Sequence, residues 1–199
     1  MNTAITLAAG LLGAALLTGC ASHRTTMGAG PAQAQVATTT TTTTTTAPAA
    51  VVRLSPADVR FVALAAGSGM YEVEASRVAL SRAADPQVRA YAQMLVDHHT
   101  QNNNELVAIV TAKGQRIGPA LPPELQQKVN KLSGLSGAEF DREYIRTTGV
   151  QDHRAAIAAF EEGRRTVTDR DLQAYIAKTM PVLRSHLQHA EDIAGKMAG

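Results

Sequence analysis

Apolar residues recur every three or four positions from residue 55 to the end of the chain, which is the spacing of one face of an α-helix. Ser55-Pro56-Ala57-Asp58 opens the first such stretch with a capping Ser, a Pro at the first helical position and an acidic residue in the first turn. A second stretch starts at Asp85-Pro86 and stops at Lys113-Gly114. These signals predict two successive long helices.

Two more long helices are predicted further along the chain. One opens at Ser136–Glu139, a sequence typical of a capping box. The other begins near Asp169 and contains Pro181, which we expect to kink it. The connection between the second and third helices, residues 115–134, includes a short helix predicted near residues 123–132. The pattern therefore predicts an all-α fold, a four-helix bundle with a long crossover that carries a short extra helix.

The second and fourth predicted helices start alike. Asp85 and Asp169 are each followed by an apolar residue three positions later and by Ala-Tyr at the fifth and sixth positions. This short match indicates two helical hairpins related by duplication, each with its turn at one of these Asp residues. In an antiparallel hairpin, residues equally far from the turn lie at the same height.

Each hairpin is thereby predicted to bring two metal-binding side chains level with each other. Glu72 and His98 both lie 13 residues from the first turn, and His153 and His186 lie 16 and 17 residues from the second. The two levels differ by about three residues, roughly 5 Å along a helix, and an axial offset of the hairpins removes that gap. All four residues fall on stripes that are otherwise apolar.

Neutral imidazole and carboxylate groups suit Zn, Fe, Cu or Mn, and facing helices of a bundle are a common place for such sites. The predicted metal ligands are Glu72, His98, His153 and His186. Five further residues would contact these ligands without binding the ion, or would replace them if a helix is rotated: Glu74, Asp97, His99, Asp152 and His189. The alternative is a purely structural polar core in which the same groups hydrogen-bond to Tyr71, Tyr91, Tyr144 or Tyr175.

The N-terminal segment has a different character. Residues 1–17 are rich in Ala, Leu and Gly. The sequence at the end of this segment, Leu17-Thr18-Gly19-Cys20, resembles the bacterial lipobox. We therefore predict a lipoprotein signal peptide at 1–19 and lipidation of Cys20, which would anchor the protein to a membrane. Ala21 after the Cys favours the outer membrane, with the protein facing the periplasm. The alternative is an ordinary secretory signal in which the Cys occurs by chance.

Residues 20–52 are predicted to be a disordered tether, because the unbroken Thr run at 38–46 is flanked by small and polar residues that cannot form a core. The helical domain then spans residues 53–199. The sequence does not specify any protein partner.

Composition and charge narrow the function further. The net charge of +2 comes from interspersed charges without a basic run, so nucleic acid is not a predicted partner. The only Cys lies in the export segment, so the domain has no disulfide and no thiol nucleophile. A metal ion with an open position could support hydrolysis or redox chemistry, but no second acid/base group is evident, and the sequence favours binding over catalysis.

Several segments together resemble one family of bacterial outer-membrane and periplasmic proteins, domain of unknown function 4142. The segments are Tyr71–Leu80, Met94–His99, Leu135–Tyr144, Asp152-His153 and Pro181–Leu187. The resemblance implies a ferritin-like bundle with a long crossover, and no settled activity. It implies polar positions at Glu72 or Glu74, Asp97, His98, Asp152, His153 and His186, but not at His99 or His189.

The chain departs from true ferritins at the metal site. Ferritin-like di-iron centres take a Glu-x-x-His pair from each of two helices, and this sequence contains no Glu-x-x-His. The resemblance to ferritins in fold therefore does not extend to a di-iron site, and a mononuclear His-rich site fits the sequence better.

Overall fold

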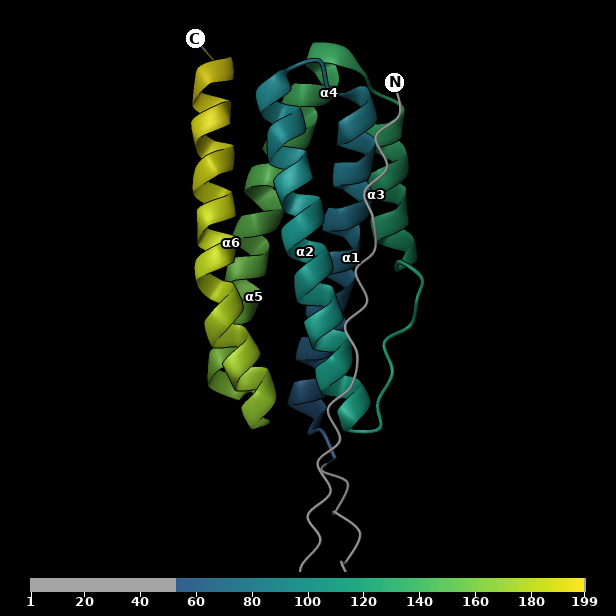
Figure 1. The fold of residues 1–199 in the computed structure, drawn as a ribbon, viewed down its shortest axis with the longest axis vertical. Helices are drawn as coiled ribbons and strands as arrows, with labels where there is room; N and C mark the ends of the chain where they lie inside the picture. Colours follow the sequence, from purple (N-terminus) through teal and green to yellow (C-terminus); the bar gives the residue numbers. More distant parts are fainter. Residues whose placement is uncertain (1–52, 199) are drawn as a thin grey trace, which may run out of the picture. The chain divides into compact units, whose positions relative to one another are not determined.

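The computed structural model describes residues 53–198 of the chain. The predicted signal peptide, Cys20 and the whole of the predicted tether lie outside the described residues. All regular structure in the described part is helical (Figure 1). In chain order the elements are α1 (Pro56–Arg82), α2 (Pro86–Ala112), α3 (Pro123–Ser133), α4 (Gly137–Tyr144), the π-helix η1 (Ile145–Asp152), α5 (His153–Thr166) and α6 (Arg170–Met197).

These elements build a bundle of four long helical rods. Helices α1 and α2 form one antiparallel hairpin, and the continuous segment α4–η1–α5 forms a second hairpin with α6. The hairpins pack through α1 against α5 and through α2 against α6 (Figure 1). The crossover between α2 and α4 carries α3, which lies along α1. The predicted all-α four-helix bundle with a long crossover and a short extra helix is confirmed.

Most of the predicted helix ends are also confirmed. Ser55 and Asp58 form a capping box at the start of α1, and Asp85 and Asp169 cap α2 and α6 with their side chains. After α2 the chain turns at Gly114, whose φ of 71° is a left-handed conformation that glycine adopts without strain.

The capping box predicted at Ser136–Glu139 is wrong. Helix α4 begins there, but the Ser136 side chain makes no capping hydrogen bond. The first residue of the helix, Gly137, has a φ of 60°, so the chain does not enter α4 through the regular first turn that a capping box requires.

Asp58 also ties the two hairpins together at one end of the bundle. Its carboxylate accepts hydrogen bonds from the backbone N–H groups of Thr168 and Asp169, at 2.8 and 3.3 Å. Burial alone would raise the pKa of Asp58, but the hydrogen bonds from Ser55, Thr168 and Asp169 outweigh it and lower the pKa to about 2. The start of α1 is therefore fixed to the turn before α6.

The buried residues divide into two apolar clusters with a polar layer between them. One cluster contains Tyr71, Tyr91, Leu95, Phe140, Tyr144 and Ile193 among others. The other cluster contains Phe61, Leu106, Phe160, Leu172, Ile176 and Leu183 among others. On α2 the gap between the clusters holds His99 and Asn102, and on α6 it holds His186. The fold therefore places imidazole and amide groups at one level inside an otherwise apolar core.

Candidate metal centre

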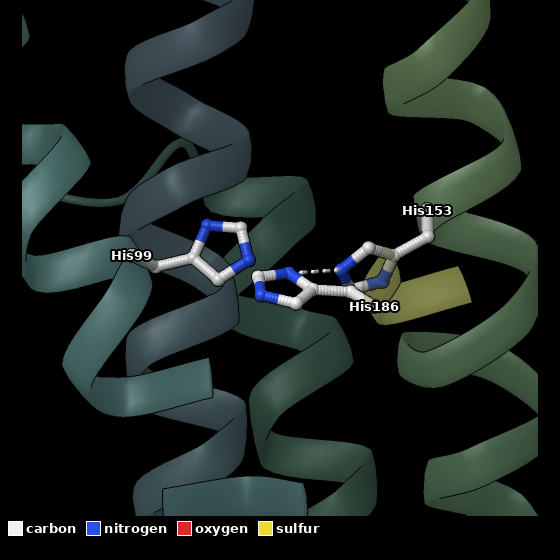
Figure 2. A group of neighbouring side chains, drawn as sticks. All are labelled: His99, His153 and His186. Atoms are coloured by element: carbon white, nitrogen blue, oxygen red, sulfur yellow. Dashed lines mark hydrogen bonds between the residues drawn. The ribbon is translucent and has the colours of Figure 1, made fainter. Parts of the chain in front are cut away.

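Three imidazole rings converge in the polar layer. His99 comes from α2, His153 is the first residue of α5, and His186 lies in the middle of α6. One ring nitrogen of each lies within 4.8 Å of the other two (Figure 2). The three residues are 5%, 0% and 1% exposed, so solvent does not compete for these nitrogens.

The four residues of the predicted metal set form one connected series of contacts. The Oε1 atom of Glu72 lies 3.6 Å from Nδ1 of His153, and Nε2 of His153 lies 3.2 Å from Nδ1 of His186. The other ring nitrogen of His186, Nε2, lies 2.8 Å from Nδ1 of His98. The reasoning from equal distances to the turn therefore selected residues that do meet in space.

The structure places the two neighbouring His residues of α2 differently from the predicted ligand set. His98 is exposed, and its ring stacks against His186 from the surface side. His99, which the sequence indicated only as a substitute, points into the bundle with the other two rings (Figure 2). The signal that identifies His99 is its register: it lies seven residues after Ala92 and seven before Leu106, and both are fully buried.

Hydrogen-bond geometry fixes the tautomers of His153 and His186. Nδ1 of His153 lies 3.0 Å from the backbone oxygen of Thr148, which can only accept, so Nδ1 carries the proton and Nε2 has the lone pair. Nε2 then accepts from Nδ1–H of His186. The Nε2 atom of His186 in turn has a lone pair that accepts from Nδ1–H of His98.

The π-helix η1 supplies the carbonyl that orients His153. Thr148 lies five residues before His153, and its side-chain Oγ1 is hydrogen-bonded to the Tyr71 hydroxyl at 2.8 Å. Gly149 lets α6 approach, because a Cβ atom there would lie 2.9 Å from the Cβ of Ala190. The π-helix was not predicted, although the run Thr147-Thr148-Gly149 is unfavourable for a regular α-helix.

The three imidazoles of the centre are held in the neutral form, which is the form that binds metals. Burial, and secondarily the neighbouring His153 and His98, lower the pKa of His186 to about 3. Burial also lowers the pKa of His99 well below its usual range and lowers that of His153, although the hydrogen bond to Thr148 opposes the shift at His153.

Glu72 is a buried carboxyl group at the edge of the three rings. Burial, and secondarily the charge of Asp152, raise its pKa well above the usual range, while Lys128 opposes the shift. The fold therefore favours the neutral acid form of Glu72. Its Oε2 atom and Nε2 of His99 are buried without a hydrogen-bond partner, a costly arrangement that a bound cation would relieve.

The donor set fits a transition-metal ion. Three neutral imidazoles that converge on one point are a ligand set typical of Zn, Cu and Fe sites. With metal–nitrogen bonds of roughly 2.0–2.1 Å, two ligands of a tetrahedral site lie about 3.3 Å apart, and His153 and His186 already have their facing nitrogens 3.2 Å apart.

The remaining predicted residues lie outside this group. Glu74 is paired with Arg77 at 2.7 Å, and the exposed Asp97 accepts a hydrogen bond from Gln93. Asp152 forms an ion pair with Lys128 at 2.5 and 2.6 Å from its two oxygens. His189 is exposed, and its ring lies edge-on to that of Tyr91 with the ring centroids 5.5 Å apart. The charge of Asp152 raises the pKa of Glu72 and opposes the lowering of the pKa of His153.

Comparisons with known proteins agree with the ferritin-like bundle and with the family resemblance. The chain belongs to the family described as domain of unknown function DUF4142, whose model matches residues 43–193. The predicted family is thereby confirmed. No curated protein matches the chain.

Two solved structures are similar in fold. A DUF305 fragment from Deinococcus radiodurans has a TM-score of 0.64 and 18% sequence identity, with 73% of this chain and 99% of that chain covered. A DUF305 protein from Streptomyces coelicolor has a TM-score of 0.62 and 14% identity, with 72% and 93% covered. At these identities the likeness concerns the fold alone, so the function has to be argued from the centre itself.

Proposed function

We propose that the domain binds one divalent transition-metal ion, Zn, Cu, Fe or Mn, in the core of the bundle. The observation that carries the proposal is the convergence of three buried, neutral imidazoles on one point. His99, His153 and His186 would hold the ion. Glu72 would ionise beside it and compensate part of its charge, since the attraction of a cation lowers the pKa of a carboxyl group.

The burial of the centre favours holding or transferring the ion over turning over a substrate. All three ligands are at most 5% exposed, and a catalytic metal site keeps an open position for substrate or water. Imidazole is a good ligand for Zn, Cu and Fe, whereas Mn prefers carboxylate and water oxygens. Zn and Cu are therefore the first ions to test.

The experiment is metal analysis and titration of protein purified without a polyhistidine tag. The wild type should take up one equivalent, and His153→Gln should lose tight binding, because this change removes a ligand from the centre. His189→Gln is the matched control, since His189 lies on α6 outside the three rings. Equal binding by the wild type and His153→Gln would contradict the proposal.

A second function is favoured by the hydrogen bonds of the polar layer. The series from Thr148 through His153 and His186 to His98 is complete without an ion. In this alternative the rings only fix the register of the helices in a structural envelope protein. It predicts no metal uptake by the wild type, so the same titration separates the two functions.

We also propose that the protein is a lipoprotein of the cell envelope, anchored in the outer membrane and facing the periplasm. The support is the lipobox-like sequence ending in Cys20. In the part of the chain that the structure describes, no helix is long and apolar enough to cross a membrane. Labelling cells with a palmitate analogue should mark the wild type and not Cys20→Ser, and fractionation should place the label in the outer membrane. An unlabelled wild type would contradict lipidation.

A further inference from the structure

His98 connects the buried centre to the protein surface. It is exposed, yet its Nδ1 atom lies 2.8 Å from Nε2 of the buried His186. The two rings are nearly parallel, with an interplanar angle of 15° and centroids 5.1 Å apart. Of the hydrogen bonds that the described residues make to the three converging rings, this one reaches an exposed side chain.

The two nitrogens of His186 face different neighbours. Nδ1 points inward to His153, and Nε2 points outward to His98. A neutral imidazole has one lone pair, and the hydrogen bonds that begin at Thr148 place it on the outward nitrogen. A cation that arrives from the surface therefore finds the lone pair of His186 already facing it, next to a second imidazole.

The spacing at this outward position suits a shared ion. Two ligands at right angles with metal–nitrogen bonds of roughly 2.0–2.1 Å lie about 2.9 Å apart, close to the 2.8 Å between His98 and His186. Imidazole nitrogens select for Zn and Cu over Mg and Ca, which prefer oxygen ligands. Water would supply the other ligands, because His98 is exposed.

Of two cavities in the described part, one is lined by none of the three imidazoles and the other by His99 alone among them. A groove of about 290 Å³ between α1, α3 and α5 ends at Tyr71, Lys128 and Asp152, and none of the three imidazoles lines it. A small cavity of about 10 Å³ is lined by His99 together with buried Ala65 and Phe160 and partly buried Ser68 and Asn103.

We propose that His98 Nδ1 and His186 Nε2 form an outer metal-binding position through which the ion reaches the three buried imidazoles. The inference rests on the proposed metal-binding function and adds the access route.

Because a neutral His186 has one lone pair, the outer and inner positions exclude each other, and the protein holds one ion in total. The ion moves inward when the proton of His186 shifts from Nδ1 to Nε2. The proton that His98 loses from Nδ1 goes to water, and water returns one to its Nε2, so the net charge of the rings is unchanged.

The test is a stopped-flow measurement of Zn²⁺ association, and of dissociation into excess chelator, for the untagged protein. The variant His98→Gln keeps a side chain that can donate to or accept from His186 but removes the imidazole ligand. A residue on the access route lowers the free-energy barrier by the same amount for entry and for exit of the ion. The association and dissociation rate constants should therefore both fall by roughly tenfold, while Kd stays unchanged. His189→Gln is the control and should match the wild type in both rate constants.

The other outcomes separate this inference from the proposed function. Unchanged rate constants in His98→Gln would overturn the access route and leave the buried centre intact. Faster dissociation with unchanged association would also overturn it, because His98 would then only hold His186 in place. His98→Phe, which retains the stacked ring, checks that either result does not come from lost packing. Absence of saturable Zn²⁺ binding by the wild type would instead overturn the proposed function.

Discussion

The two hairpins contribute to the metal centre in different ways. In the hairpin of α5 and α6, both nitrogens of His153 and both nitrogens of His186 have hydrogen-bond partners. In the hairpin of α1 and α2, Oε2 of Glu72 and Nε2 of His99 are buried without partners. Each such atom costs about 1–3 kcal/mol. The α5–α6 hairpin therefore holds its ligands in fixed orientations. The α1–α2 hairpin buries polar atoms without hydrogen-bond partners, and a bound ion would interact with them.

The largest expected effect is loss of metal binding when the preorganised hairpin is changed. His153→Gln removes a ring whose orientation is fixed by Thr148. We expect Kd to rise by more than about 100-fold, beyond what the loss of an orienting group behind a ligand produces. Competition with a chromophoric chelator measures this value. A Kd equal to that of His189→Gln would show that the α5–α6 hairpin does not bind the ion.

Acidification should destabilise the metal-free protein, because the folded state keeps the three rings neutral. Their pKa values are lowered in the folded state, to about 3 for His186. The unfolded chain therefore binds more protons below its own histidine pKa of about 6.5. The stability that the neutral His186 ring contributes is present above that pH and is lost as the pH falls toward 3, at about 1.4 kcal/mol per pH unit. The lowered pKa values of His99 and His153 act in the same direction. Urea unfolding from pH 7 to pH 4.5 measures the loss, and a flat profile would contradict neutral buried rings.

Glu72 should give the opposite pH dependence in the metal-free protein. Its pKa is raised by burial, so the folded state binds the extra proton. This contribution to stability is complete below the usual carboxyl pKa of about 4.3 and is lost as the pH rises through the raised value. Glu72→Gln should therefore unfold at a higher urea concentration relative to the wild type as the pH increases. Adding Zn²⁺ should reverse this advantage, since the ion favours the carboxylate. An advantage that does not depend on pH would contradict a neutral Glu72.

A smaller effect is expected from the packing around the π-helix. Gly149→Ala places a methyl group 2.9 Å from the Cβ of Ala190 and should cost about 1–3 kcal/mol of unfolding free energy. Gly195→Ala on α6 is the matched control, because a Cβ there meets no atom within 4 Å. The control should stabilise the helix by about 0.5–1 kcal/mol. Equal melting temperatures for the two variants would contradict the close approach of η1 and α6.

The helices were largely predictable because their ends are local. Capping residues such as Ser55 and Asp169 and the left-handed Gly114 act within one turn of the chain. Ser136 was misjudged because the conformation of Gly137 cannot be read from the capping pattern alone.

The level of the candidate site along the bundle axis was predictable from the sequence, but the rotation of α2 about its own axis was not. Equal distances from the second turn placed His153 level with His186, and their rings do meet. Glu72 was placed about three residues away along the axis, and its carboxyl lies 3.6 Å from His153. The choice between His98 and His99 depends on about 100° of helix rotation, which the packing of α2 against α1 and α6 decides. The orientation of His153 depends on the π-helix, whose carbonyl at Thr148 is a tertiary feature without a sequence motif.

The ligand set itself can be observed by X-ray absorption at the edge of Zn or Cu in protein loaded with one equivalent. Three imidazole nitrogens at roughly 2.0–2.1 Å from the metal are the result expected from His99, His153 and His186. A shell of water and carboxylate oxygens with no imidazole, or protein that retains no metal, would contradict a metal centre in the bundle core.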